Sequence, residues 1–530
     1  MGKNKYTEEQ INFVKNLVEK GSLVTPATEL MCLHFNIDYK ESIGRTFRKK
    51  MQKTGVTNNV STIEDTDVFK EAQNKQHDKS KKRFIISWAQ SDTPVHKGFL
   101  KNIESYAQEI DAQILIIAGR YRSPSSLKAS KDLENKEKNI ANTWDTSVLS
   151  YLDAARHNIH EHLVVLSDVK IQPTSSMPLT GLNSITGLES CIIGHPRQHL
   201  KSLPVIQGYP HKLLLSTGAI TVANYTDSSV GAKGSFHHHI GCVVVELDED
   251  IFHIRQITAD SEGDFYDLIY CLKNGEVCIC KEGVPALIMG DLHIGEEDKI
   301  AVDTSFKIAD LLKPYKIFIH DAINGHSVSH HEQKDPFLLL EREENGSWCL
   351  QRELDEAVNW FKKYPQYKFI SVQSNHNEFI DRWLRSEDWR KVKNKKLYLK
   401  FANIVAEGLA PKGIVAYIFE KELPNVYSLE VDESYNIMGW ELGIHSHIGV
   451  HGSKSSPTQL KNLPVKSVVG HSHVANRTDG SLSVGTLTKL RVGYNKGASG
   501  WLHSNVVLYP NGKCSHINII NGKFTTFVID

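Results

Sequence analysis

Apolar and polar positions alternate along the chain in a way that separates three regions and one connecting segment. In residues 1–57 the helical spacing of apolar residues predicts three short helices. Thr7 is placed to cap the first, Thr25-Pro26 opens the second, and the third covers Tyr39 to Lys53. This size and order predict a small domain of helix-turn-helix type. Residues 58–82 are polar and poor in periodic apolar positions, so they are interpreted as a linker.

A second region, residues 83–283, begins with two strongly apolar runs, RFIISWAQ and AQILIIAG, on either side of a helical segment around residues 99–110. That order predicts a β-α-β start, and the later runs HLVVLSD, KLLLSTGAITV and GCVVVELDED predict further strands. We therefore expect a central α/β domain, whose role the sequence does not indicate. The triplet at 237–239 and the pair His195/Arg197 are candidates for a metal or phosphate site, but consecutive histidines point in different directions on any regular element.

The third region, residues 284–530, repeats one pattern, in which an apolar run of strand type ends in Asp, Asn or His. The five runs are ALIMGDLH, KIFIHDAIN, KFISVQSNHNE, WELGIHSHIG and KSVVGHSH. Polar loops at the carboxyl ends of rigid strands are where α/β proteins assemble active sites. We therefore expect these polar side chains to meet at one edge of a sheet.

The side chains at these strand ends suit divalent metal ions. Asp and Asn supply oxygen, neutral imidazole supplies nitrogen, and no thiolate is present, so Mn²⁺, Mg²⁺, Fe²⁺ or Zn²⁺ would fit, with Mn²⁺ expected. Asp291 and His293 are two residues apart and can bind one ion together, and His471 and His473 repeat that spacing. Asp321 is the natural bridge between two ions, which such a carboxylate holds about 3.5–4 Å apart.

Taken in order, D-x-H, a strand-end Asp with Asn three residues later, N-H, a lone His and G-H-x-H resemble the calcineurin-like metallophosphoesterase superfamily. The resemblance covers about residues 284–515 and implies an αββα sandwich for residues 284–530. It also implies two metal-binding sets: Asp291, His293, Asp321 and His473 for one ion, and Asp321, Asn375, His445 and His471 for the other. His376 would face the substrate phosphate, protonating the leaving oxygen or stabilising charge, and Asn324 would orient substrate.

Two motifs depart from the family pattern. His320 stands where glycine usually precedes the bridging Asp, and the third motif is S-N-H-N-E instead of G-N-H followed by Asp or Glu. The lone-His position has three candidates in GIHSHIGVHG; His445, directly after the apolar run, is preferred and His447 is second. A single histidine of this kind is more often structural, and only the five motifs in order make the metal interpretation strong.

Composition narrows the range of partners. Lys plus Arg and Asp plus Glu are equal at 62 each, so any nucleic-acid surface must be local. The eight cysteines are scattered, the first residues lack an apolar signal core, and no run of about 18 apolar residues is present. We expect a cytoplasmic protein without membrane contact, in the host cytoplasm if phage-encoded. It could form a homo-oligomer.

The motifs also discriminate among phosphoesterases. The arginines of the phosphoprotein-phosphatase patterns are missing, whereas repair nucleases of the SbcD type share the minimal ligand set, a histidine after the Asn, and an accessory DNA-binding region. Residues 484–524 resemble the C-terminal part of phage-encoded metallophosphoesterases, and the three-part layout is similar to that of a phage nuclease that degrades the host genome. The resemblance therefore implies a metal-dependent deoxyribonuclease.

Two sets of basic residues are candidate DNA contacts. The third predicted helix carries a basic stripe, and the tail carries cations and aromatics beside the expected metal edge: Arg45, Arg48, Lys49 and Lys53 in the first set, and Lys489, Arg491, Tyr494, Lys496 and Trp501 in the second. The stripe is equally compatible with a solvated or assembly face, and the tail residues with ordinary strands and turns. Two alternatives stay open: a small-molecule phosphodiesterase or phosphatase, and a DNA-binding regulator with an inactive phosphoesterase domain.

Overall fold

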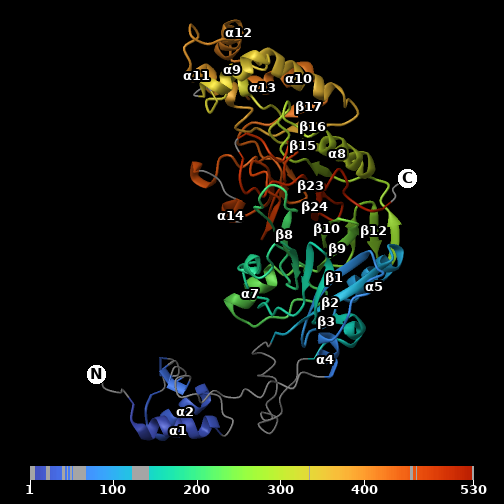
Figure 1. Ribbon diagram of the computed structural model, residues 1–530, viewed down its shortest axis with the longest axis vertical. Coiled ribbons are helices and arrows are strands. Elements are labelled where there is room, and N and C mark those ends of the chain that lie inside the picture. The colour runs from blue at the N-terminus through green and yellow to red at the C-terminus, as the bar shows by residue number, and fades with distance from the viewer. Residues whose placement is uncertain are drawn as a thin grey trace. The chain divides into compact units, whose positions relative to one another are not determined.

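A computed structural model describes residues 6–19, 24–38, 42–43, 46–47, 50–51, 67–121, 143–332, 335–453, 457–460, 462–493 and 495–527. These residues form two compact units, one within residues 1–71 and the other comprising residues 72–121 and 144–527 (Figure 1). Each unit is described by itself. The chain is a mixed α/β protein with several sheets, which confirms the predicted class.

The first unit contains helices α1 (Glu8–Glu19) and α2 (Val24–His34). As predicted, Thr7 caps α1: the Gln10 amide donates to Thr7 Oγ1 at 3.3 Å, and the Gln10 side chain accepts from the Thr7 amide at 3.0 Å. The core packs Val14, Met31 and Phe47, all buried, against one another. Arg45, Arg48, Lys49 and Lys53, the predicted basic stripe, lie outside the described residues.

The predicted linker, residues 58–82, contains a short helix in its described part. Helix α4 (Asp67–Gln73) buries Phe69 and Ala72, each 3% exposed. The Ala72 carbonyl also accepts a hydrogen bond from the Ala154 amide at 3.0 Å. Two apolar side chains three residues apart lie on one face of a helix, and they are too few to show as a periodic pattern.

The second unit begins with the predicted β-α-β arrangement. Strands β1 (Arg83–Gln90) and β2 (Ala112–Gly119) are parallel, and α5 (Lys97–Glu109) connects them. They belong to a five-stranded sheet of order β10-β9-β1-β2-β3, completed by β3 (Leu152–Asp153), β9 (Gly241–Asp248) and β10 (Ile251–Thr258). A three-stranded antiparallel sheet follows, with β11 (Phe265–Asp267), β12 (Tyr270–Lys273) and β13 (Glu276–Ile279).

A ten-stranded sheet has the order β18-β19-β20-β22-β21-β7-β8-β6-β5-β4. Its central-region strands are β4 (Arg156–His160), β5 (Leu163–Leu166), β6 (Ser190–Ile193), β7 (Leu200–Leu203) and β8 (Lys212–Ser216). Its other strands are β18 (Asn436–Ile437), β19 (Trp440–Glu441), β20 (Lys466–Val469), β21 (Asn476–Thr478) and β22 (Ser481–Ser483). Because β7 pairs with β21, the border predicted between residues 283 and 284 falls inside one continuous sheet.

A six-stranded sheet has the order β17-β16-β15-β14-β23-β24. Its strands are β14 (Ala286–Ile288), β15 (Ile317–Ile319), β16 (Phe369–Ser371), β17 (Val426–Ser428), β23 (Ser504–Leu508) and β24 (Cys514–Asn518), and β14 to β17 are parallel to one another. One apolar core lies between this sheet and the ten-stranded sheet, joining Ile288 and Phe318 to Trp440 and Val468. A second core covers the other face with helices.

The helices of that second core include α8 (Lys299–Leu312), α10 (Leu350–Lys362), α11 (Phe379–Ser386), α12 (Lys395–Ala406) and α13 (Ile414–Glu422). Figure 1 shows α9 (Pro336–Glu344) and α10 to α13 gathered beyond β15 to β17. The remaining helices are α7 (Ser229–Phe236) and α14 (Pro457–Leu460), with 3-10 turns η2 (Thr146–Tyr151), η3 (Leu182–Ser184), η4 (His326–Val328) and η5 (Val450–Gly452). The layers are thus helix, sheet and sheet around the strand ends of β14 to β16.

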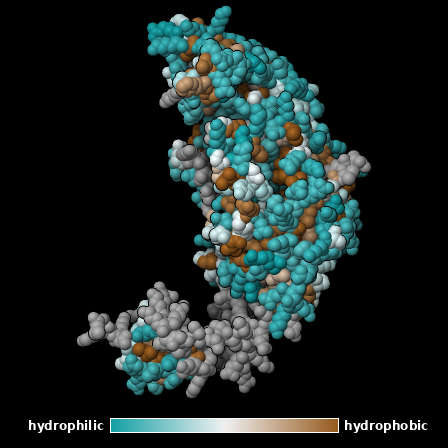
Figure 2. Space-filling model, in the orientation of Figure 1, coloured by the Kyte–Doolittle hydropathy of each residue, from teal (hydrophilic) through white to brown (hydrophobic). Residues whose placement is uncertain are grey.

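On the face seen in Figure 2, hydrophobic residues form small groups among hydrophilic ones. None of the helices within the described ranges combines the length and the apolar character needed to cross a bilayer.

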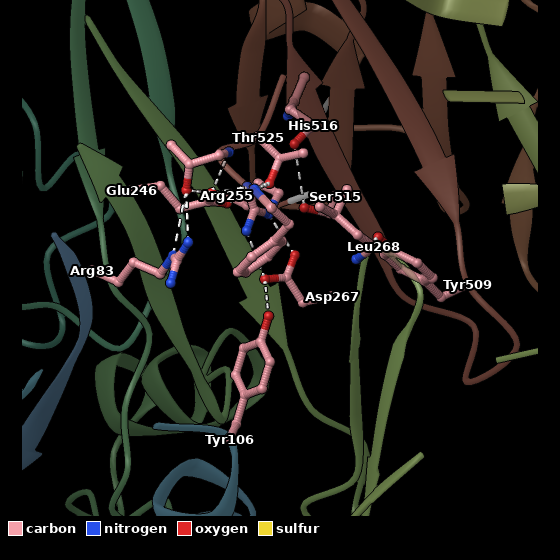
Figure 3. A network of polar contacts seen from close by, with 12 residues as sticks. Arg83, Tyr106, Glu246, Arg255, Asp267, Leu268, Tyr509, Ser515, His516 and Thr525 are labelled. Atoms are coloured by element: carbon pink, nitrogen blue, oxygen red, sulfur yellow. Dashed lines mark hydrogen bonds and ion pairs between the residues drawn. The ribbon is translucent and has the colours of Figure 1, made fainter. Parts of the chain in front are cut away.

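A buried charge network joins the five-stranded sheet to the chain's last described segment (Figure 3). Arg255 contacts Glu246 Oε1 and Asp267 Oδ1, each at 2.5 Å, and all three side chains are at most 1% exposed. Tyr106 donates to Asp267 at 2.8 Å, and the Thr526 amide donates to Glu246 at 2.6 Å. Charges removed from water to this extent depend on complete pairing.

Replacing Arg255 by Met should therefore destabilise the protein strongly, because Glu246 and Asp267 would stay buried without a cation. The expected loss is about 3–5 kcal/mol of unfolding free energy, measured by urea denaturation. Arg352→Met is the matched control, since that arginine pairs with Glu356 on the surface with 61% of its side chain exposed, and it should leave the midpoint unchanged. Equal midpoints for the two variants would contradict the assigned role of the network.

Candidate metal centre

The five predicted polar clusters follow five strands, which belong to two sheets rather than to one. The first three runs end β14, β15 and β16 of the six-stranded sheet, and the last two end β19 and β20 of the ten-stranded sheet. Backbone hydrogen bonds join the first two strand ends directly: the His293 amide donates to the Asp321 carbonyl at 2.7 Å, and the Leu292 amide to the His320 carbonyl at 3.0 Å. The polar side chains converge because the two sheets pack face to face.

Four of the predicted ligands have left-handed backbone conformations. The φ angles are 46° at His293, 46° at Asp321, 72° at His471 and 57° at His473. Such conformations are uncommon for residues with a Cβ and cost of order 1–3 kcal/mol each. Four of them at one place indicate that the chain is held so as to direct these side chains inward.

Asp321 lies between two imidazoles. Its Oδ2 atom is 3.2 Å from His293 Nε2 and 3.2 Å from His445 Nε2, and the carboxylate is 1% exposed. This is the arrangement of a carboxylate that can bridge two cations, one on each side. The structure therefore brings the predicted bridge into contact with one predicted ligand from each metal-binding set.

Asp291, His293, Asp321 and His473 form one compact group whose ligand atoms all lie within 4.8 Å of one another. His473 Nε2 is 3.2 Å from Asp291 Oδ2 and 3.1 Å from His293 Nε2. All four side chains are buried, so this group can hold a metal ion.

Several buried polar atoms at this centre make no hydrogen bond of suitable geometry, although His445 Nε2 and Asp291 Oδ2 each have a neighbour at 3.2 Å. These atoms are both carboxylate oxygens of Asp291, Asp321 Oδ1, Asn375 Oδ1, His320 Nε2, His445 Nε2 and His473 Nδ1. Buried polar atoms are nearly always satisfied in proteins, so a cluster of oxygen and nitrogen lone pairs without hydrogen bonds fits a site that binds a cation. These donors are the hard and borderline ligands that a divalent ion prefers.

The close packing of the centre also requires glycine at position 470. A Cβ there would lie 2.8 Å from His320 Cγ and would collide with the Asp291 carboxylate. The glycine of G-H-x-H therefore lets the β20 strand end approach the first two.

His320 is a candidate ligand that sequence reasoning missed. With Asp291 and His445 it forms a second group of possible metal ligands within 4.8 Å, and its Nδ1 lies 3.3 Å from His445 Nδ1. It had been noted only as a departure from the family's glycine. The available signal was its position next to Asp321 at a strand end, which gives access to the same centre.

The pKa values follow from burial and crowding. Burial and then the neighbouring Asp321 raise the pKa of Asp291 well above its usual range. Burial also acts to raise the pKa of Asp321, but the imidazoles of His445 and His293 lower it well below its usual range. Burial lowers the pKa of His445 to about 4 and that of His473 to about 3, so both rings are neutral near pH 7. Neutral imidazole is the form that binds metal.

The two remaining predicted ligands are His471, which lies near His445, and Asn375. The His471 ring centroid is 5.2 Å from that of His445, although His471 is in neither compact group. Asn375 is partly buried and presents the unpartnered Oδ1 already noted. His447 lies farther out, with Nε2 3.6 Å from Glu378 Oε1, so the geometry favours His445 for the lone-His position.

His376 and Asn324 lie together at the rim of the centre. His376 Nδ1 is 2.7 Å from the Asn324 carbonyl oxygen, and its ring packs edge-on against His293 with centroids 4.3 Å apart. Since a carbonyl oxygen can only accept, Nδ1 carries the proton and Nε2 is left for another partner. Burial, reinforced by His293, lowers the pKa of His376 to about 3.

The Asn324 side chain contacts His326, which in turn contacts Glu332. Arg342 on α9 binds Glu332 at 2.7 Å and His326 at 2.6 Å, which fixes this side of the rim. The sequence had given no indication of this chain of contacts.

Of the predicted tail residues, Trp501 contacts a residue of the centre and Lys489 contacts Glu296, which also lies 3.4 Å from His326. Trp501 packs against the His473 ring at 4.1 Å between centroids, and Lys489, with 60% of its side chain exposed, is 3.6 Å from Glu296. The Arg491 guanidinium instead donates to the carbonyls of Gly497 and Val205, the latter at 2.9 Å. Lys496 is exposed, and Tyr494 lies outside the described residues.

The histidines of the central region lie in different contacts. His195 and His238 donate to or accept from backbone and tyrosine groups, whereas Arg197, His199 and His237 surround Asp479 on the β21–β22 turn, with Arg197 at 2.7 Å. None of these residues is in a compact metal-binding group among the described residues. The contacts of Arg197, His199 and His237 with Asp479 tie the two parts of the ten-stranded sheet together.

The chain was compared with protein-family models, known proteins and solved structures. No protein-family model and no solved structure matches the chain. The chain is 29% identical over 476 residues, covering 84% of its length and 83% of the relative's, to "Protein A1" of Escherichia phage T5. The similarity thus extends over most of both proteins and connects this chain with a phage protein whose printed name states no activity.

Proposed function

We propose that the chain is a two-metal phosphodiesterase that hydrolyses DNA, built on an αββα metallophosphoesterase sandwich in residues 284–530, whose second sheet is continued by strands of the central region. The observation that carries the proposal is Asp321, placed 3.2 Å from an imidazole of each metal-binding set, among buried lone pairs that lack partners. The helix, sheet and sheet layers around the ends of β14 to β16 support the sandwich.

The proposed ligands would divide between two ions. Asp291, His293, Asp321 and His473 would hold one, while Asp321, Asn375, His445 and His471 would hold the other, with His320 close enough to add a ligand or to orient His445. Two bound divalent ions would supply an activated nucleophile and stabilise the charge of the phosphoryl group. Mn²⁺ is the proposed metal.

His376 would act on the phosphate itself. Its Nδ1–H is held by the Asn324 carbonyl, so Nε2 is directed by the backbone rather than by a flexible partner. From there it can exchange a proton with a substrate oxygen or stabilise charge developing on it. Asn324 would thus set the orientation of His376 as well as contact substrate.

DNA is the proposed substrate because of the motif resemblance to SbcD-type nucleases, the phage relative, and the cations and aromatic ring beside the centre. The host cytoplasm is the proposed place of action.

The deciding assay is metal-dependent digestion of linear, circular and single-stranded DNA, with a chromogenic phosphate bis-ester tested in parallel. Hydrolysis of DNA that needs Mn²⁺ and stops with chelator supports the proposal. Hydrolysis of the bis-ester without any DNA cleavage would instead indicate a small-molecule phosphodiesterase, and no hydrolysis of either would indicate a DNA-binding regulator.

Neutralising the predicted basic stripe should weaken DNA binding without changing bis-ester hydrolysis. Replacing Arg45, Arg48, Lys49 and Lys53 by Gln removes up to four phosphate contacts, and each lost contact should reduce the slope of log K against log salt by roughly 0.9 for duplex DNA. Binding measured by fluorescence anisotropy across a salt series checks this. An unchanged affinity and slope would leave DNA binding to other parts of the chain.

A further inference from the structure

The rim of the metal centre includes a loop that presents an aromatic ring. Residues 497–503 connect the segment that carries Lys489 and Arg491 to β23. Within this loop the indole of Trp501 packs against the His473 ring, with the ring centroids 4.1 Å apart and an angle of 67° between the ring planes. Trp501 is partly exposed, although its neighbours Leu502 and His503 are buried. A large aromatic side chain at the edge of a polar metal centre is in contact both with a ligand ring and with solvent.

The central region of the chain fixes this loop. Ser499 forms an antiparallel bridge with Val205, and Ser202 Oγ donates to the Gly500 carbonyl at 2.8 Å. Arg491 donates to the carbonyls of both Val205 and Gly497. The residues that precede Trp501 are therefore held by hydrogen bonds to the central region. The segment between β7 and β8 lies alongside the loop that carries Trp501.

That β7–β8 segment adds one exposed aliphatic and one exposed aromatic side chain. Ile206 is 63% exposed and Tyr209 50% exposed, on the segment whose Val205 pairs with Ser499. An exposed lysine precedes each of the two loops: Lys489 comes before residues 497–503, and Lys201 on β7 comes before the β7–β8 segment. Aromatic rings with interspersed cations are the composition of surfaces that bind single-stranded nucleic acid, where rings stack on bases and cations contact phosphates.

We propose that Trp501 stacks on a nucleobase next to the phosphate being cleaved, and that the β7–β8 segment extends this surface, so that the substrate strand is unpaired at the metal centre. This rests on the proposed nuclease function and deepens it. In a duplex each base is covered by its neighbours, so a tryptophan beside the scissile phosphate can stack only on a base that has left the helix. Single-stranded DNA and frayed ends are thus the preferred substrate class.

The test compares Trp501→Leu and Trp501→Phe with the wild type on three substrates: a single-stranded oligonucleotide, the same strand with abasic sites flanking the cleaved bond, and a chromogenic bis-ester. Leu keeps apolar packing against His473 without a π face, and Phe keeps a smaller one. Trp389→Leu is the matched control, because that tryptophan is 46% exposed and lies on the segment between α11 and α12.

For Trp501→Leu we expect KM for the base-bearing strand to rise about 5- to 150-fold with little change in kcat, since stacking contributes equally before and in the transition state. Trp501→Phe should recover part of this loss. The wild type should prefer the base-bearing strand over the abasic strand, and Trp501→Leu should not. Trp389→Leu should hydrolyse the bis-ester as the wild type does, and Trp501→Leu should lose far less on the bis-ester than on the base-bearing strand.

Equal losses on all three substrates would show that Trp501 only supports His473, and an unchanged KM would show that Trp501 does not contact DNA. Either result overturns the stacking inference. DNA cleavage by the wild type would still support the proposed nuclease function. A wild type that hydrolyses the bis-ester but cleaves no DNA would overturn both.

Discussion

Replacing Asp321 by Asn should abolish phosphodiesterase activity and weaken binding of both metal ions. The carboxylate contacts His293 and His445 from the same oxygen, so the amide removes a negative charge at the point where two cations would meet. Two cations in one pocket then repel each other with less compensation. We expect the loss in kcat/KM to exceed the roughly 10⁴-fold upper range for losing a general acid or base.

Metal content by elemental analysis and Mn²⁺ titration calorimetry measure the binding, and thermal unfolding with and without Mn²⁺ gives an independent readout. Mn²⁺ should raise the melting temperature of the wild type but not that of Asp321→Asn, because an ion that binds only the folded state stabilises it. Asp303→Asn, on the exposed face of α8, is the control and should behave as the wild type. Full occupancy of both sites with a normal rate in Asp321→Asn would exclude the bridging role.

Secondary structure was predictable where an apolar run was long enough to indicate a buried strand. Arg83–Gln90 and Ala112–Gly119 are eight-residue runs, and both are strands with the bounds that the pattern gives. The five runs that end in polar clusters are also strands, although β14, β15 and β16 keep only three residues each and β19 only two. Their polar ends could be predicted because Asp, Asn and His side chains interrupt the apolar runs.

The way the strands combine could not be predicted. The pairing of Leu200 and Lys201 in β7 with β21 joins residues more than 270 positions apart, and neither short strand has a pattern that names its partner. Side-chain periodicity reports which face is buried, not which strand lies beside it. The distribution of the five ligand strands between two sheets was missed for the same reason.

At the site itself, sequence reasoning placed side chains better than it described their surroundings. The D-x-H and G-H-x-H motifs predicted that Asp291, His293 and His473 lie together, and all three are in the compact group. His320 was overlooked because it was considered only as a replacement for the family's glycine. The ability of its imidazole to bind a metal ion was not considered. The contact of Trp501 with His473 joins two loops that are distant in sequence, and a local sequence pattern does not predict such a contact.

Replacing His376 by Ala should leave both proposed metal sites intact and slow turnover by about 10²–10⁴-fold, because in the proposed mechanism the ring acts on substrate rather than on metal. The structure holds its Nδ1 at 2.7 Å from the Asn324 carbonyl and places it in no compact ligand group. Elemental analysis should therefore find wild-type metal content while single-turnover cleavage is slow. His331→Ala, an exposed histidine of the same region, is the control.

The dependence on the leaving group separates the two roles that His376 could have. If the imidazole protonates the leaving oxygen, its loss should matter most for DNA, whose alkoxide leaves poorly, and little for an aryl bis-ester whose phenolate needs no proton. If it stabilises charge on the phosphate, both substrates should lose similar factors. Because burial lowers the pKa of this ring to about 3, it is neutral before substrate binds, and a proton donor would have to gain its proton in the complex. Normal rates on both substrates in His376→Ala would remove it from the mechanism and leave the metal ligands to account for catalysis.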